Sequence, residues 1–277
     1  SPHVQGLLDT APLRRFLLAS LHPAGNGEIE GIARNIAAGR LRALAITTSS
    51  YSTGQSVIWV QGSDIQNWER PNRRSRKTAI TVEHIMASAA LPLFFPAVRL
   101  DDGWYGDGGI RLTAPLSPAI HIGAKRILAI STRYLPTAEE QGTGMIDDYP
   151  PPAQVVGAMF SAIFLDAFDN DALRLERINT LIKYTTEEHD HDLEAVKLFL
   201  LRPSQNLGKM ANQFEANLPR TFRFMTRGLG TKETRSNDLL SMVMFQQDYI
   251  SELLALGYAD AESRLDEISA FFDEDSE

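Results

Sequence analysis

Short apolar runs typical of strands alternate with helical periodicities along this chain, and that alternation constrains its fold more than any other feature. The runs predict strands at 41–48, 57–60, 97–100, 126–131 (expected to be buried) and 195–201. Apolar residues that recur every three or four positions predict helices at 10–21, 28–38, 82–90 and 156–168, with a further helix beginning at Pro115. Strands that alternate with helices favour a layered α/β core.

Proline and glycine residues interrupt this pattern. Pro92 must end or distort the helix over 82–90, because its ring removes a hydrogen-bond donor and restricts the preceding residue. Four prolines and two glycines between residues 136 and 152 predict a loop or lid. From about Asn206 onward the pattern is helical. We therefore expect an α/β core over 1–205 and a helical extension over 206–277.

Composition narrows the classes of function. The 277 residues are 43% hydrophobic and 22% charged, which is ordinary for a globular protein. The net charge of -8 argues against nucleic acid as a partner, because affinity for a phosphate backbone comes largely from basic residues. Without cysteine there is no disulfide and no thiolate metal site. No apolar run approaches the roughly 20 residues that span a bilayer, so we expect a soluble or peripherally membrane-associated protein.

The segment Gly106-Asp107-Gly108-Gly109 is the clearest candidate for chemistry. An aspartate between glycines, directly after an aromatic strand, lies where the backbone can approach a substrate and where positive φ angles cost little. Aspartate and glycine are also common turn residues. From the motif alone, a tight turn with a self-capping aspartate is the favoured interpretation.

The neighbours of this motif change that interpretation. The segments 87–96 (ASAALPLFFP), 104–109 (WYGDGG) and 115–124 (PLSPAIHIGA), in this order and spacing, resemble the patatin-like phospholipase family. The resemblance continues at 51–54, 202–204, 227–230 and 256–261, in a form similar to bacterial members. It therefore covers most of the chain.

The resemblance implies a fold and an activity. The fold would be a three-layer α/β/α sandwich with additional C-terminal helices, and the activity would be hydrolysis of carboxylic esters of lipids without a metal or other cofactor. In the family, a serine in a Gly-x-Ser-x-Gly elbow attacks the ester carbonyl, and the aspartate of the Asp-Gly-Gly motif activates it without a histidine. Asp107 matches that aspartate, and Gly106, Gly108 and Gly109 would shape its loop.

The serine elbow itself is missing from these residues. No serine has glycine both two positions before and two positions after it, and Ser56 fails because Ile58 follows where glycine is required. The glycine-rich segment that supplies oxyanion donors in the family is also missing. We expect residue 1 to lie downstream of the elbow in a longer hydrolase, so that this chain alone is inactive and associates with the missing segment or with a second copy. The alternative is a non-catalytic lipid-binding or protein-interaction module on the same scaffold.

Charged segments give two weaker candidates. A basic loop beside Trp68, which could bind anionic lipid headgroups, consists of Arg70, Arg73, Arg74, Arg76 and Lys77. The segment 187–192 (EEHDHD) could bind a divalent ion. Solvated surface loops are the favoured interpretation of both, so we predict no metal site.

Histidine and aromatic residues give the remaining candidates. His84 and His121 would be required only in a Ser-His-Asp arrangement, and packing roles are favoured. Phe94, Phe95 and Trp104 could line an acyl-chain groove or simply pack in the core. A helical canopy that gates access or mediates dimer contacts is suggested by Phe214, Leu218, Phe222 and Met225. We expect the protein to act in the cytoplasm or at a membrane surface of a bacterium.

Overall fold

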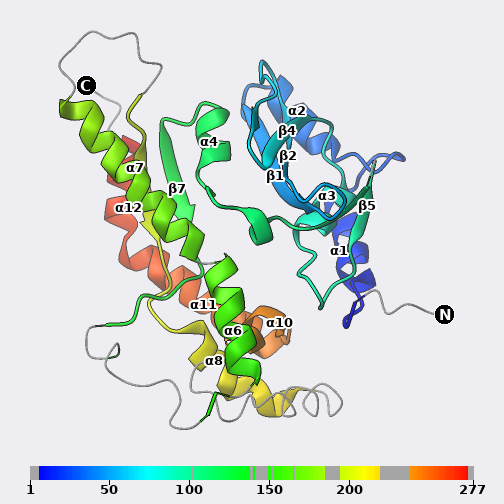
Figure 1. Cartoon of the computed structure of the whole chain (residues 1–277), viewed down its shortest axis with the longest axis vertical. Coiled ribbons are helices and arrows are strands. Elements are labelled where there is room, and N and C mark those ends of the chain that lie inside the picture. The colour runs from blue at the N-terminus through cyan, green and yellow to red at the C-terminus, as the bar shows by residue number, and fades with distance from the viewer. Residues whose placement is uncertain are drawn as a thin grey trace. The chain divides into compact units, whose positions relative to one another are not determined.

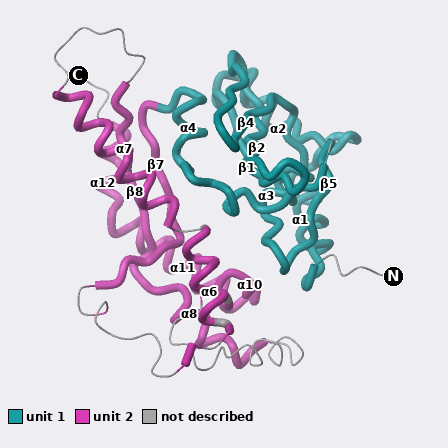
Figure 2. Tube along the Cα trace, viewed as in Figure 1, with its two compact units in different colours: residues 1–124 teal, residues 125–277 magenta. Residues whose placement is uncertain are grey.

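The computed structural model describes residues 6–101, 103–137, 140, 149–150, 152–164, 166–184, 194–218 and 238–273. The chain divides into two compact units, residues 1–124 (unit 1) and residues 125–277 (unit 2) (Figure 2). Figure 1 labels the helices and strands of each unit. The predicted boundary between residues 205 and 206 remains a prediction.

Unit 1 contains the helices and strands that the sequence predicts, together with β3, β4 and the short helix η1, which it does not predict. Its helices are α1 (Ala11–Leu21), α2 (Glu30–Ala37), α3 (Val82–Ser88), the short 3-10 helix η1 (Gly108–Arg111) and α4 (Ser117–His121). Its strands are β1 (Ala43–Ser50), β2 (Ser56–Gly62), β3 (Glu69–Arg70), β4 (Arg73–Lys77), β5 (Val98–Leu100) and β6 (Gly103–Asp107). Strand β1 continues through Ser50, beyond the predicted end at residue 48.

The strands of unit 1 form one six-stranded mixed sheet in the order β3-β4-β2-β1-β6-β5. Strand β2 pairs with β4 in parallel, and the other neighbouring strands are antiparallel. The prediction of a basic loop over 70–77 was wrong, because these residues form β3 and β4. Ser75 of β4 is hydrogen-bonded to Trp68, the residue before β3. Its hydroxyl accepts the Trp68 N–H at 2.7 Å, and its own N–H donates to the Trp68 carbonyl at 2.9 Å.

Both faces of this sheet are covered. Along β2, Val57 and Trp59 point into an apolar cluster that includes residues of α2 and α3, with Leu17 and Leu21 of α1 packed against it. Ile58 points to the opposite face, where it packs in a second cluster with Trp68 and with Ile122 at the end of α4. Alternation of side chains along a strand explains this division. A mixed sheet with helices on both faces confirms the α/β class and the expected layers.

Unit 2 is mainly helical. Its strands β7 (Arg126–Ile130) and β8 (Lys197–Leu201) pair in parallel. Its helices are α6 (Pro152–Phe164), α7 (Asp166–Tyr184), α8 (Leu207–Phe214), the 3-10 helix η2 (Glu215–Asn217), α10 (Asp238–Val243), α11 (Gln247–Ser263) and α12 (Leu265–Asp273). Helix α7 extends well beyond the predicted helix at 156–168. The expectation of a buried strand at 126–131 was wrong, because Ile127 and Ala129 are buried whereas Ile130 is 77% exposed.

Polar contacts and an apolar cluster hold unit 2 together. Asn179 of α7 bonds both the N–H and the carbonyl of Val196, at 3.0 and 2.8 Å. Helices α8, α10 and α11 share one cluster, to which the canopy residues Phe214 and Leu218 contribute. Both pack within their own unit, and a canopy that gates access or mediates dimer contacts remains a prediction. The canopy residues Phe222 and Met225, the segments 187–192 and 227–230, and most of the predicted lid lie outside the described residues.

Candidate active site

Asp107 is the last residue of β6 and the N-cap of η1. Its N–H donates to the carbonyl of Ala90 at 3.0 Å, which fixes the end of the strand. Its Oδ1 accepts the Gly109 N–H at 2.7 Å. No other hydrogen bond joins the Asp107 side chain to a described residue. One carboxylate oxygen is thus anchored, and the second is left to accept a proton.

The flanking glycines are required by close packing. A Cβ at Gly108 would lie 2.3 Å from the carbonyl oxygen of Thr47, and a Cβ at Gly106 would lie 2.4 Å from the hydroxyl of Tyr51. Gly109 supplies the N–H that holds Asp107. None of the three glycines has a positive φ angle, so the motif does not use the left-handed backbone that glycine permits at little cost. Their role in admitting a substrate remains a prediction.

The environment of Asp107 makes its carboxylate a stronger base. Burial raises the pKa of Asp107 above 3.8, and the hydrogen bond from Gly109 offsets part of that increase. Burial also raises the pKa of Tyr51, and the charge of Asp107 adds to this increase. A carboxyl group with a raised pKa is better matched to proton transfer near neutral pH than an ordinary aspartate.

A tight turn at 51–55, between β1 and β2, borders Asp107. The Tyr51 N–H donates to the Trp104 carbonyl at 2.9 Å, which places the turn beside β6. Gly54 has a φ of +65° and donates its N–H to the Ser50 carbonyl at 3.0 Å. The guanidinium of Arg111 lies against Gly54, with Nη2 3.4 Å from the position of an added Cβ. The sequence did not indicate that Tyr51 lies near the aspartate or that Arg111 lies against Gly54.

Neither candidate histidine, both of which the structure describes, forms a hydrogen bond with Asp107. His84 is buried, its Nδ1 accepts the Thr81 N–H at 3.1 Å, and it completes the capping box of α3. Burial lowers the pKa of His84, although the charge of Asp101 partly opposes this. His121 stacks on Trp68 with ring centroids 4.8 Å apart, and its Nδ1 lies 3.1 Å from the Ser117 hydroxyl. Both histidines have packing and capping contacts.

The other aromatic candidates divide between core and surface. Phe94 is buried and Phe95 packs against the main apolar cluster of unit 1. Trp104 is 46% exposed, with the Arg99 guanidinium 6.0 Å from its ring centroid. Core packing accounts for the two phenylalanines, and an acyl-chain groove remains a prediction.

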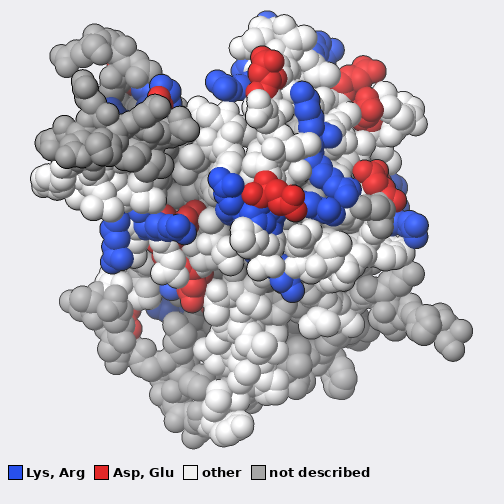
Figure 3. Space-filling model, turned by 45° about the horizontal axis from the view of Figure 1, so that its top comes forward, with Lys and Arg blue, Asp and Glu red and all other residues white. Residues whose placement is uncertain are grey.

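The basic side chains of β3 and β4 are partly engaged. The Arg76 guanidinium lies 5.6 Å from the ring centroid of Trp59, and Arg73 donates to the Ala114 carbonyl at 3.5 Å. On the face that Figure 3 shows, basic side chains are interspersed with acidic ones. Binding of anionic lipid through this hairpin remains a prediction.

The described part of the chain contains neither a cluster of metal-ligating side chains nor a helix able to span a membrane. Histidine, aspartate and glutamate side chains nowhere gather there into a group that could hold a metal ion. Among the same residues, no helix combines the length and apolarity needed to cross a bilayer.

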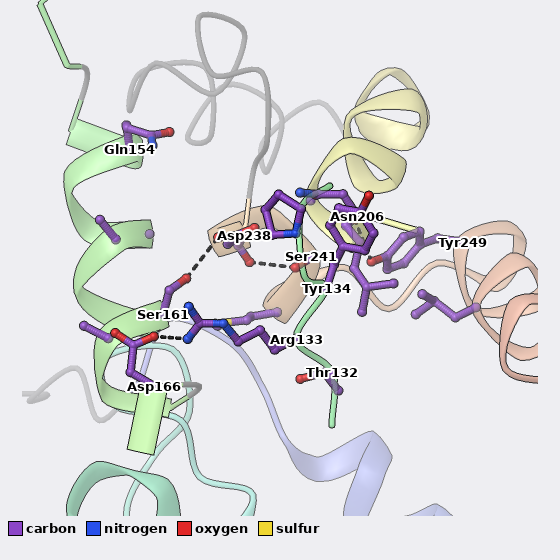
Figure 4. A pocket seen from close by; sticks show the side chains of 18 residues that line it. Thr132, Arg133, Tyr134, Gln154, Ser161, Asp166, Asn206, Asp238, Ser241 and Tyr249 are labelled. Atoms are coloured by element: carbon purple, nitrogen blue, oxygen red, sulfur yellow. Dashed lines mark hydrogen bonds and ion pairs between the residues drawn. The ribbon is translucent and has the colours of Figure 1, made fainter. Parts of the chain in front are cut away.

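Unit 2 contains a cavity of about 500 Å³ between α6, α8, α10, α11 and the segment 132–136 (Figure 4). The Ser161 hydroxyl points across it and donates to Asp238 Oδ2 at 3.0 Å. Arg133 forms an ion pair with Asp166 at its edge. Ser161 and Asp238 are separated by 77 positions and belong to no short motif, so no sequence pattern predicts this pair.

Comparison with known proteins supports a family for the part of the chain that holds Asp107. The model of the family "Patatin-like phospholipase" matches residues 4–120, which include the turn at 51–55, Asp107 and its glycines. No curated protein matches the chain. The bacterial type remains a prediction. Residues 4–120 are thus similar to the patatin-like phospholipase family.

Proposed function

We propose that the protein is a serine hydrolase that cleaves carboxylic esters of lipids, with Asp107 as the general base of a Ser-Asp dyad. The observation that carries the proposal is the state of the Asp107 carboxylate. One oxygen is held by the Gly109 N–H at 2.7 Å, the other has no hydrogen bond with a described residue, and burial raises the pKa. An anchored, partly desolvated carboxylate is suited to take a proton from a hydroxyl group.

The reaction would proceed in two proton-transfer cycles. Asp107 removes the proton of the serine hydroxyl while the serine Oγ attacks the ester carbonyl carbon. The protonated Asp107 then gives that proton to the departing alcohol. Water attacks the resulting acyl-serine with Asp107 again as base, which releases the fatty acid and restores the serine. No metal or other cofactor enters this scheme.

The serine is the missing component. Because the 277 residues hold no Gly-x-Ser-x-Gly sequence, we propose that a segment of the protein outside them supplies the nucleophile. The chain by itself would then have no hydrolase activity until it associates with that segment, in the same molecule or in a second copy. The lipid substrate would be met by peripheral contact with a membrane.

The test is covalent labelling of the natural protein that contains these residues. Intact mass spectrometry after treatment with a fluorophosphonate should show one adduct, and peptide mapping should place it on a serine outside these 277 residues. Asp107→Asn should slow the labelling strongly, whereas Asp64→Asn, in an exposed turn of the same unit, should not. Absence of an adduct, or labelling unaffected by Asp107→Asn, would refute the hydrolase.

A non-catalytic lipid-binding or protein-interaction module is the alternative, and the missing serine elbow is the observation that favours it. This module would bind phospholipid vesicles and would take no fluorophosphonate label. Ser161 offers a further check, because its hydroxyl is already bonded to a carboxylate. An adduct on Ser161, removed by Ser161→Ala, would assign the chemistry to unit 2 and not to Asp107.

A further inference from the structure

The cavity of unit 2 owes its space to small side chains on one face of α6. All the described residues that line it belong to unit 2. Helix α6 contributes residues that the helical repeat places on one face: Gly157, Ala158, Ser161 and Ala162. The bulky Met159 and Ile163 of the same helix are exposed and do not line the cavity. The resulting volume of about 500 Å³ is in the range of pockets that bind small molecules.

The wall across from α6 is largely apolar and is held by the core of the unit (Figure 4). Leu207 of α8 and Leu253 of α11 line the cavity and pack against the apolar cluster that joins α8, α10 and α11. Tyr249 belongs to the same cluster, and its hydroxyl donates to the Leu207 carbonyl at 3.5 Å. Burial raises the pKa of Tyr249 to about 12, so its phenol is neutral at ordinary pH. A wall fixed in this way needs little ordering when an apolar ligand binds.

One hydrogen bond forms the polar point of the cavity. The Ser161 hydroxyl of α6 donates to Asp238 Oδ2 of α10 at 3.0 Å (Figure 4). Because the only hydrogen of the hydroxyl is used in this bond, the Ser161 oxygen can only accept a further hydrogen bond. An ionised carboxylate is likewise an acceptor only. A ligand group that meets this pair must therefore donate a hydrogen bond, as an alcohol does and an ether, ester or carboxylate does not.

The charges around the cavity disfavour an anionic ligand. Arg133 is the one basic residue among the described residues that line it. Its guanidinium forms ion pairs with Asp166 and, at 3.3 Å, with Asp169. Asp169 also pairs with Arg202, so Arg133 is held in a network of charges at the edge of the cavity. Since Asp238 adds a negative charge at the polar point, a carboxylate or phosphate head would be repelled there.

We infer that this cavity binds an uncharged amphipathic molecule, with its apolar body against the small residues of α6 and a hydroxyl head that donates to Ser161 or Asp238. A medium-chain alcohol is the simplest molecule with this chemistry. The site belongs to unit 2, outside the residues 4–120 that are similar to the patatin-like phospholipase family. It involves no bond cleavage, so it stands independently of the proposed hydrolase.

The test is a saturation-transfer difference NMR titration of the natural protein that contains these residues. It compares 1-octanol with 1-methoxyheptane, an ether of the same size without a donor, and with octanoate. Each comparison ligand should bind about tenfold more weakly than 1-octanol. The double change Ser161→Ala and Asp238→Leu makes the polar point apolar. It should weaken 1-octanol about tenfold and should not weaken 1-methoxyheptane.

A second pair of variants tests the place of binding. Ala158→Phe fills the cavity and should abolish binding of 1-octanol, whereas Met159→Phe adds the same ring at the next, exposed residue of α6 and should not change it. Far-UV circular dichroism during heating reports whether each variant is folded. Octylammonium tests the charge of the head. Tighter binding of octylammonium or octanoate than of 1-octanol would overturn the inference, and so would equal binding of the ether or binding unaffected by Ala158→Phe.

Discussion

Two aspartates, one in each unit, are held in opposite ways. Asp107 of unit 1 is fixed by a backbone N–H from Gly109 at 2.7 Å and keeps its second oxygen unengaged among the described residues. Asp238 of unit 2 accepts the Ser161 hydroxyl at 3.0 Å in an open cavity. A serine is thus already hydrogen-bonded to an aspartate in unit 2. The family match, however, covers only residues of unit 1, where Asp107 has no hydrogen bond to a described serine. If Asp107 is the catalytic carboxylate, as proposed, proximity to a serine is a poorer guide to such a residue than backbone anchoring with a second oxygen left unengaged.

The largest expected effect separates these two aspartates directly. In the natural protein, Asp107→Asn should lower the rate of ester hydrolysis by about 10² to 10⁴-fold, the usual contribution of a positioned base. Asp238→Asn removes the same charge in unit 2 and should leave the rate within about twofold, since it is outside the proposed mechanism. Hydrolysis of a short-chain phospholipid measures both. If Asp238→Asn lowers the hydrolysis rate more than Asp107→Asn does, the aspartate of unit 2 and not that of unit 1 takes part in the reaction.

The second largest effect concerns glycine substitutions in the two units, because Gly108 is closely packed and Gly257 is not. Gly108→Ala forces a methyl group to within 2.3 Å of the Thr47 carbonyl and should destabilise unit 1 by about 1–3 kcal/mol. Gly257→Ala adds a methyl group to α11 with nothing within 4 Å, and should stabilise that helix by up to about 1 kcal/mol.

Separate probes are available for the two glycine variants. The three tryptophans of the chain, Trp59, Trp68 and Trp104, all belong to unit 1, so urea titration followed by fluorescence reports on Gly108→Ala. Hydrogen exchange of α11 peptides reports on Gly257→Ala. A Gly108→Ala protein as stable as the wild type would show that β6 and β1 separate easily, and the proposed rigidity of the site would fail.

The Ser161–Asp238 bond should contribute a smaller amount. Ser161→Ala removes one hydrogen bond to a carboxylate and should reduce the protection of α6 and α10 by about 1 kcal/mol or more. Hydrogen exchange of peptides from these helices measures it, with Ser251→Ala on α11 as a control, since that hydroxyl bonds only a carbonyl of its own helix. Equal effects of the two changes would mean that the Ser161–Asp238 bond contributes no more to stability than the Ser251 bond to a carbonyl of its own helix.

The sequence anticipated the parts of the molecule that depend on local patterns. Strands β1 and β2, helix α3 and its end before Pro92 follow from apolar patterns and proline, and Asp107 follows from its resemblance to a family motif. Strand β4 was missed because four of its five residues, Arg73, Arg74, Arg76 and Lys77, are charged, and only their pairing with β2 makes them a strand.

Contacts between distant segments could not be read from the sequence. Tyr51 reaches Gly106 across the β1–β6 pair, and Arg111 reaches Gly54 from η1. Each contact depends on strand register, which spacing along the chain does not specify. The glycines of the motif were recognised, but the sequence could not show that close packing against Thr47 and Tyr51, without any positive φ angle, requires two of them.

The smallest expected effect concerns stability and pH at Asp107 itself. Burial raises the pKa of this carboxyl in the folded protein above 3.8, so the folded state binds the proton more tightly than the unfolded state. Stability of unit 1 therefore decreases as pH rises from about 3.8 through the folded pKa, and the loss is complete above it. Asp107→Asn keeps an acceptor for the Gly109 N–H but has no charge to bury. The variant should be more stable than wild type near neutral pH, with the advantage shrinking as the solution is acidified.

Tryptophan fluorescence during urea titration at a series of pH values measures this difference, with exposed Asp64→Asn as the control that should show none. A constant difference between Asp107→Asn and wild type at every pH would mean that the carboxyl is not desolvated. The same series tests the comparison of the two aspartates. Asp107 is expected to lower the stability of unit 1 when it is ionised, as a residue kept for its chemistry can do. Asp238, which accepts a hydrogen bond from a hydroxyl group, is expected to contribute to the stability of unit 2. Asp238→Asn should therefore destabilise unit 2 at the same pH at which Asp107→Asn stabilises unit 1.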